Sequence, residues 1–566
     1  MRTAFGILLL VSAASAQTHL HGPEPVEAPT DLGKLPAPRH IDGIGHSHIG
    51  ITTKSAEAQQ WFDQGLATLH CFWYYEALRA FEQALRLDPD CAMCHWGISR
   101  ALDFQGRDEQ AKQEIRAAQN LAAKTSDREQ RYIRAYFDFE EKSGDDATHA
   151  FNQQMESLID HYPDDVEAKL LYALSLMAGY DAKGEPRPGA AYSQTILREL
   201  LWEYPENAAA NHYWIHLIES SGHPEWALES AQKLARLAPA SGHMVHMPGH
   251  IFYRTGNYEK AHQAFLDSLR VDREYMKTQG VSAEDNWNYE HNLSYLIATC
   301  AEEGRLQEGR EYARELQGLI KDPGPPARFN FNVLQIASTA SRLSIRFARW
   351  DDAIAHPIHF DVPDAELSLA TRAYRDGLVE YAQGMKSAES GQLADAESHS
   401  GQLDAMLWRI SQEHLKGDVM HARDRVAKIL GTASLELRGN IAGRRNDWDA
   451  ARSLLEQAQQ SEVEIGYAEP PRYARPALEV LGDLLIRAGK FDESREAYRK
   501  VLDERPHSGW ALFGIAVAWQ KQGKGPEAAK AFHEFLDAWS HADQDLPEIK
   551  TAQAYLANAA PSSTAP

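Results

Sequence analysis

Residues 478–532 read LEVLGDLLIRAGKFDESREAYRKVLDERPHSGWALFGIAVAWQKQGKGPEAAKAF. Four positions of this stretch recur at one fixed spacing with a residue of similar kind: Gly482, Gly489, Ser494 and Tyr498 are followed by Ala516, Gly523, Ala528 and Phe532. A period of about 34 residues with these columns indicates stacked helix–turn–helix units.

The same period occurs elsewhere in the chain. Gly222, Ala227 and Ala231 are followed at this spacing by Gly256, Ala261 and Phe265, and Gly65, Ala77, Phe81 and Ala84 occupy the same columns near the start. Small residues such as Gly65 let antiparallel helices approach, while an aromatic such as Phe81 fills the gap between layers. Gly222, Gly256 and Gly489 suit the turn between paired helices. Five prolines are expected to end second helices because proline cannot continue the helical hydrogen bonding: Pro89, Pro163, Pro205, Pro239 and Pro506.

These repeats predict an all-α fold, a right-handed superhelical solenoid of about eleven to twelve tetratricopeptide-like helix pairs. We expect an N-terminal array with a histidine-rich groove over residues 51–320 and a more degenerate array over residues 321–545. Residues 17–50, which contain Pro and His, predict an extended, loosely ordered lead-in. Residues 546–566 are expected to form a disordered tail.

The N-terminus predicts export. Arg2, the apolar run 4–11 and the small residues 14–16 fit a signal peptide over residues 1–16, so we expect a periplasmic or secreted protein. No later segment is apolar for long enough to cross a membrane, so we expect no membrane insertion. Acidic residues outnumber basic ones 81 to 58 and the formal charge is −23, which argues against nucleic acid as a partner.

The chain resembles a family of secreted bacterial tetratricopeptide-repeat proteins over about residues 40–310. The motifs that carry the resemblance are Ile51-Thr52-Thr53, Phe62-Asp63-Gln64-Gly65-Leu66, Glu76-Ala77, Asp88-Pro89-Asp90-Cys91-Ala92-Met93, Trp96-Gly97, Asn211-His212-Tyr213-Trp214-Ile215-His216, His246-Met247-Pro248-Gly249-His250-Ile251 and His291-Asn292. The resemblance implies the repeat fold and an export route, but no established activity.

Two histidine pairs stand in equivalent columns. His212 and His216 are four residues apart, and His246 and His250 repeat that spacing one repeat period later in the chain. Residues four apart share one helix face, and in tetratricopeptide proteins this face of the first helix lines the concave groove. We therefore expect the two pairs to converge on one groove patch, flanked by His243 and His291.

Two interpretations of this patch stay open. Our first is a scaffold whose groove binds a peptide, a protein partner or a small ligand, with no cofactor. The alternative is a transition-metal site for copper or zinc formed by His212, His216, His246 and His250. Glu219 or Tyr253 would then add an oxygen ligand or an outer contact. No catalytic motif occurs in the chain, so we do not expect an enzyme.

The cysteines allow a further alternative. Cys91, Cys94 and His95 match the attachment signature of c-type haem, although the match falls at a junction between repeats, where packing residues are needed. We instead expect Cys71 to form a disulfide with Cys91 or Cys94, as export permits. Cys300 is expected to be a small buried apolar residue.

Overall fold

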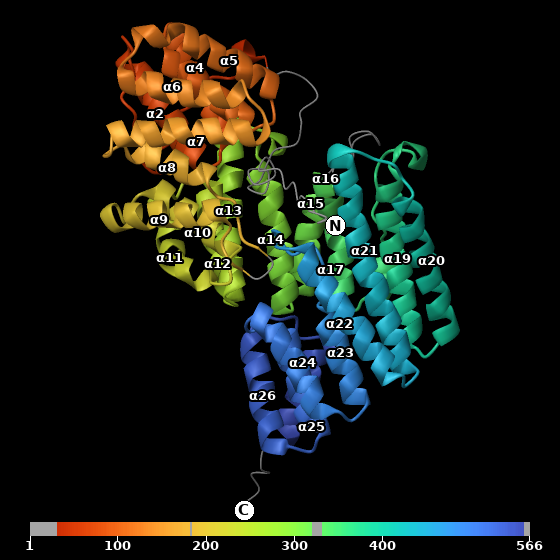
Figure 1. Ribbon diagram of the computed structural model, residues 1–566. Coiled ribbons are helices and arrows are strands. Elements are labelled where there is room, and N and C mark those ends of the chain that lie inside the picture. Colours follow the sequence, from red (N-terminus) through yellow and green to blue (C-terminus); the bar gives the residue numbers. More distant parts are fainter. Residues whose placement is uncertain (1–30, 182–183, 320–330, 560–566) are drawn as a thin grey trace, which may run out of the picture. The chain divides into compact units, whose positions relative to one another are not determined.

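The computed structural model describes residues 31–181, 184–319 and 331–559 (Figure 1). Within these ranges the chain forms 26 α-helices, α2 to α27, and no β-strand. Tyr180 and Pro186 form an isolated β-bridge in the same part of the chain. The prediction of an all-α repeat fold is confirmed.

The chain divides into two compact units. Unit 1 comprises Met1–Ile251 and Asp267–Tyr289, and unit 2 comprises Phe252–Leu266 and Glu290–Pro566. This division differs from the predicted boundary at residue 320, because the chain alternates between the two units over residues 251–290 before it continues in unit 2.

Most of the helices follow one another through brief turns. Those wholly in unit 1 are α2 (Ala56–His70), α3 (Tyr74–Leu87), α4 (Ala92–Asp103), α5 (Asp108–Leu121), α6 (Asp127–Glu140), α7 (Gly144–His161), α8 (Val166–Ser175), α9 (Pro188–Glu203), α10 (Ala208–Glu219) and α11 (Leu228–Leu237). Three helices contribute to both units: α12 (Gly242–Arg254), α13 (Tyr258–Gln279) and α14 (Trp287–Glu303). Those wholly in unit 2 are α15 (Leu306–Gln317), α16 (Phe331–Ala337), α17 (Thr339–Arg346), α18 (Trp350–Ala355), α19 (Leu369–Glu389), α20 (Leu393–Ser411), α21 (Gly417–Arg444), α22 (Trp448–Ile465), α23 (Ala477–Arg487), α24 (Phe491–Glu504), α25 (Gly509–Lys521), α26 (Gly525–Ala538) and α27 (Pro547–Ala559).

The predicted columns of small and aromatic residues form the packing between helices. In unit 1 the ring of Phe81 lies against two glycines: a Cβ at Gly65 would lie 2.6 Å from that ring, and one at Gly97 would lie 2.5 Å from it. In unit 2 Tyr498 lies in the same way against Gly482 and Gly514, at 2.5 and 2.2 Å. Any larger residue at these glycines would push the helices apart.

The observed helix ends agree with the predicted positions of proline and glycine. Each of the five predicted prolines stands two residues after the last residue of a second helix: Leu87, His161, Glu203, Leu237 and Glu504. Gly256 and Gly489 have φ angles of 76° and 74°, which a glycine adopts without the strain of a side chain.

Two terminal predictions, the lead-in over residues 17–50 and the tail over residues 546–566, are wrong for the parts that the structure describes. Apart from a short 3-10 helix at Leu32–Lys34, residues 31–50 are extended but not loosely ordered. Ile44 and Ile49 are buried, and Arg79 donates hydrogen bonds to the carbonyls of Pro36 and Ala37. The expected disordered tail contains α27, because its Ile549 and Ala552 bury against the array. The predicted signal peptide, residues 1–16, lies outside the described residues.

Candidate metal centre

Two neighbouring first helices of unit 1 carry the histidines. In α10, the side chain of Asn207 caps the helix by accepting from the amide of Ala210, and His212 and His216 follow one turn apart. In α12, His243 lies in the first turn and His246 and His250 follow, again four residues apart. The i, i+4 spacing therefore presents each pair on one side of its helix.

These five imidazoles are buried rather than exposed on a groove. His212, His246 and His250 are 0 % exposed, and His216 and His243 are 4 % and 3 % exposed. His291 is half-buried and packs edge-on against Tyr295 in unit 2. The prediction of an open binding patch is wrong for the five buried residues; the aromatic rings of Phe72 and Trp287 cover part of the group.

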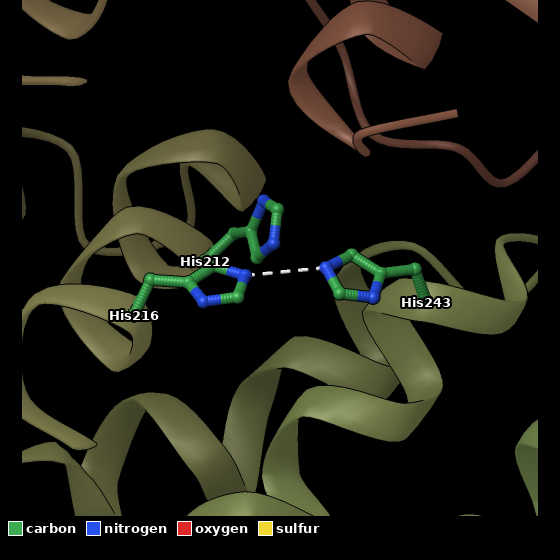
Figure 2. A group of neighbouring side chains, drawn as sticks. All are labelled: His212, His216 and His243. Carbon is green, nitrogen blue, oxygen red and sulfur yellow. Dashed lines mark hydrogen bonds between the residues drawn. The ribbon is translucent and has the colours of Figure 1, made fainter. Parts of the chain in front are cut away.

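The structure groups His212, His216 and His243 together (Figure 2). One ring nitrogen of each lies within 4.8 Å of the other two. The Nε2 atoms of His216 and His243 face each other at 3.2 Å. The metal prediction had grouped the two i, i+4 pairs; His243, expected only as a flanking residue, is instead part of the central cluster. We call these three residues the triad.

The other ring nitrogen of each triad histidine meets an oxygen acceptor. His212 Nδ1 lies 2.7 Å from the carbonyl of His70, and His216 Nδ1 lies 2.9 Å from Glu219 Oε1. His243 Nδ1 lies 3.2 Å from Asn288 Oδ1. Because a carbonyl or carboxylate oxygen can only accept, Nδ1 is the donor in each ring. An imidazole in its neutral form has one N–H, so with Nδ1 as the donor its Nε2 then carries a lone pair toward the cluster.

Asn288 is itself held in this orientation. Its Nδ2 donates to Asp272 Oδ2 at 2.7 Å, which leaves Oδ1 for His243. Burial raises the pKa of Asp272 to about 7 in spite of its hydrogen bonds from Asn286 and Asn288. Asp272 thus fixes the orientation of the Asn288 amide, and the amide fixes the tautomer of His243.

The turn between α2 and α3 closes one side of the triad. Phe72 has a φ of 55°, and its ring lies 4.6, 5.1 and 5.7 Å from those of His212, His216 and His243. Trp287 Nε1 donates to the Phe72 carbonyl at 3.0 Å, and the indole packs on His243. A non-glycine residue in this conformation is strained and persists only where its surroundings hold it.

Glu219 links the triad to the second pair. Its Oε1 accepts from His216 and its Oε2 lies 2.5 Å from His250 Nδ1. His250 Nε2 in turn lies 2.7 Å from His246 Nε2. Glu219, which the metal hypothesis names as an oxygen ligand or an outer contact, thus hydrogen-bonds to one ring of each set. Tyr253, the other candidate, packs instead on Tyr258 and Tyr295 in unit 2.

Sequence reasoning missed His70, Phe72 and Asn288. His70 is the last residue of α2 and Phe72 lies in the turn that follows, several repeats before α10 in the chain, and only a backbone carbonyl and a ring face take part. Asn288 carries no motif that separates it from an ordinary polar residue.

The predicted disulfide of Cys71 with Cys91 or Cys94 is wrong, whereas Cys300 is buried as predicted. Cys91 pairs with Cys94, with Cα atoms 5.3 Å apart, while Cys71 and Cys300 are free and buried. Cys91 caps α4 and Cys94 follows in its first turn, which brings the two thiols together; the Cys71 thiol instead donates to the Ile44 carbonyl. Haem attachment would require this disulfide to be reduced, and His95 is held by Glu114 at 2.6 Å.

None of the described helices is long and apolar enough to span a membrane.

Solved structures similar in fold include yeast Tom70 (13% identity, 88% of this chain and 96% of that chain, TM-score 0.29). A tetratricopeptide repeat protein from Parabacteroides merdae also matches (14%, 56% and 98%, 0.26), as does the human IFIT1 dimer with m7Gppp-AAAA (11%, 79% and 90%, 0.35). No curated protein matches the chain.

The tetratricopeptide-repeat family model matches residues 74–127, 437–508 and 479–543. These segments include the stretch from which the repeat period was read. Such repeats generally mediate protein binding, and no specific activity follows from the match. The chain therefore carries tetratricopeptide repeats.

Proposed function

We propose that this repeat protein binds a transition-metal ion through the triad His212, His216 and His243. The observation that carries the proposal is the shared orientation of the three rings: each Nδ1 is tied to an oxygen acceptor, and the Nε2 atoms face one another. Metal-binding histidines usually donate their second ring N–H to a carbonyl or carboxylate in this way.

The distances suit such an ion. Two nitrogens bound to one zinc ion at about 2.0–2.1 Å in tetrahedral geometry lie about 3.3 Å apart. His216 and His243 already stand 3.2 Å apart. Two lone pairs at this separation repel unless a cation lies between them. A bound proton or a metal ion satisfies that requirement, and three converging imidazoles favour the metal.

The ligand set favours copper or zinc. Imidazole suits these metals, whereas magnesium and calcium prefer oxygen ligands. The aromatic cover from Phe72 and Trp287 keeps the triad away from solvent, which strengthens its interaction with a cation. Three protein ligands also leave a fourth position for a small molecule such as water.

Elemental analysis of the purified chain tests this proposal. We expect copper or zinc to remain after desalting, and His243→Gln or His216→Gln to lose the ion bound by the triad while the helical circular dichroism signal is retained. His262→Gln, a buried histidine of unit 2, is the matched control and should keep the metal. Wild-type protein that takes up neither metal when supplied with both would contradict the proposal.

The metal proposal is compatible with the predicted role as a protein-binding scaffold. A tetratricopeptide fold is typical of protein–protein interaction, and a buried metal would stabilise such a scaffold without occupying its outer surface.

Export is a separate proposal, supported by the composition of residues 1–16. Intact mass of protein from the periplasm should place the mature N-terminus at or near Gln17, and a retained Met1 would contradict export.

A further inference from the structure

The second histidine pair repeats the construction of the triad. His246 and His250 stand four residues apart in α12, as His212 and His216 do in α10, and they lie one repeat period further along the chain. His246 and His250 are both 0 % exposed. The repeat architecture thus places a second set of imidazole nitrogens beside the first.

Glu219 orients one ring in each set. Its two carboxylate oxygens lie 2.9 Å from His216 Nδ1 and 2.5 Å from His250 Nδ1. Both rings must donate to it, so both direct an Nε2 lone pair away from the carboxylate. In the triad this lone pair faces His243, and in the second pair it faces His246.

We infer that His246 and His250 hold a second metal ion of the same class, and that Glu219 supports both ions as their shared outer carboxylate. This inference rests on the proposed function of the triad. The Nε2 atoms of the pair lie 2.7 Å apart, which is a hydrogen-bonded distance. To bind one ion they must separate to about 3.3 Å, a change that small rotations of the two rings provide.

The single carboxylate makes the two positions interdependent. Removing an outer partner of a metal-bound histidine typically lowers metal affinity about 10- to 100-fold. A substitution of Glu219 should therefore lower the affinity for both ions, whereas a substitution of His243 or His246 should abolish the binding of one ion. This pattern distinguishes a paired centre from two unrelated sites.

Titration of the metal-free full-length chain tests the inference, with zinc and copper(I) supplied in separate experiments against a competing chelator. We expect the wild type to bind two equivalents of metal per chain in at least one of the two titrations. His246→Gln and His243→Gln should each bind one equivalent, and Glu219→Gln should bind both about 10- to 100-fold more weakly.

The outcomes separate the two proposals. One wild-type equivalent, lost in His243→Gln and unchanged in His246→Gln, would overturn the second ion and leave the triad intact. No equivalents in the wild type would overturn both. If a variant fails to fold, the wild-type stoichiometry of one or two still decides the inference. His262→Gln should match the wild type throughout.

Discussion

Two buried histidine environments occur in the same repeat array, and they differ in what faces the imidazole. In unit 1, the Nε2 of His216 faces another imidazole at 3.2 Å. In unit 2, His262 lies between two carboxylates, with Nδ1 3.1 Å from Glu303 and Nε2 3.1 Å from Glu308. Both histidines are nearly inaccessible to solvent. Burial alone therefore does not say what a histidine does.

The pKa values follow the contacts in unit 2. Burial lowers the pKa of His262, but its interactions with Glu303 and Glu308 outweigh burial and leave the pKa raised. The pKa of Glu308 is lowered to about 2, chiefly by its hydrogen bond to His262. His262 is thus a charged partner within an ion network that includes Arg305, and needs no metal. In the triad an imidazole faces an imidazole instead, an arrangement that a bound cation stabilises.

A cysteine also lies near His262. The Sγ of Cys300 is 4.0 Å from His262 Nδ1, so these two side chains and Glu308 bring three metal-binding groups together. Burial raises the pKa of the Cys300 thiol well above its usual value. Both ring nitrogens of His262 are already paired with carboxylates, those of Glu303 and Glu308, so neither is directed at a vacant ligand position. We therefore expect the metal at the triad and not at His262.

The largest expected effect is on the stability of unit 2. His262→Ala should destabilise the metal-free chain by about 3 kcal/mol, because it leaves Glu303 buried beside a single cation. His243→Gln should cost about 1 kcal/mol in the same state, the worth of an ordinary hydrogen bond. Denaturant unfolding measures both, and equal losses for the two variants would remove the contrast.

The second effect is stabilisation by metal. A metal supplied at about 100 times its dissociation constant should stabilise the wild type by about 2.7 kcal/mol for each ion bound. Calorimetry in the presence and absence of zinc or copper measures this shift. His262→Gln should retain the shift and His243→Gln should lose the part owed to the triad. A metal response that depends on His262 and not on His243 would contradict the assignment of roles.

The smallest effect is the pH dependence of unit 2. Because the pKa of His262 is raised above 6.5, its contribution to stability is fully present below pH 6.5 and is lost as the pH rises through the folded value. The contribution of Glu308 is present above pH 4.5 and is lost as the pH falls toward about 2. Thermal scans of the metal-free chain from pH 6 to 9 should show a decline that His262→Gln reduces. An unchanged decline in that variant would place its origin elsewhere.

The sequence predicted the fold well because its determinants are local and periodic. The contacts of Phe81 with Gly65 and Gly97, and the helix ends before Pro89 and Pro506, follow from repeat columns. The triad was only partly predictable. The four-residue spacing identified His212 and His216, but the choice of His243 over His246 depends on how α10 and α12 are offset.

The missed features depend on contacts that sequence spacing does not encode. His70, at the end of α2, contributes a carbonyl, and Phe72, in the turn that follows, contributes a ring face; both are far from α10 in the sequence. The pairing of Cys91 with Cys94 depends on the start of α4, where the capping residue and the first turn bring two thiols together.

Anomalous diffraction from crystals of the full chain grown with zinc or copper tests the central claim most directly. We predict a peak about 2.0–2.1 Å from the Nε2 atoms of His212, His216 and His243, with each Nδ1 still bonded to its oxygen acceptor. No peak at the triad in metal-loaded crystals, or a peak at His262 in its place, would contradict the account.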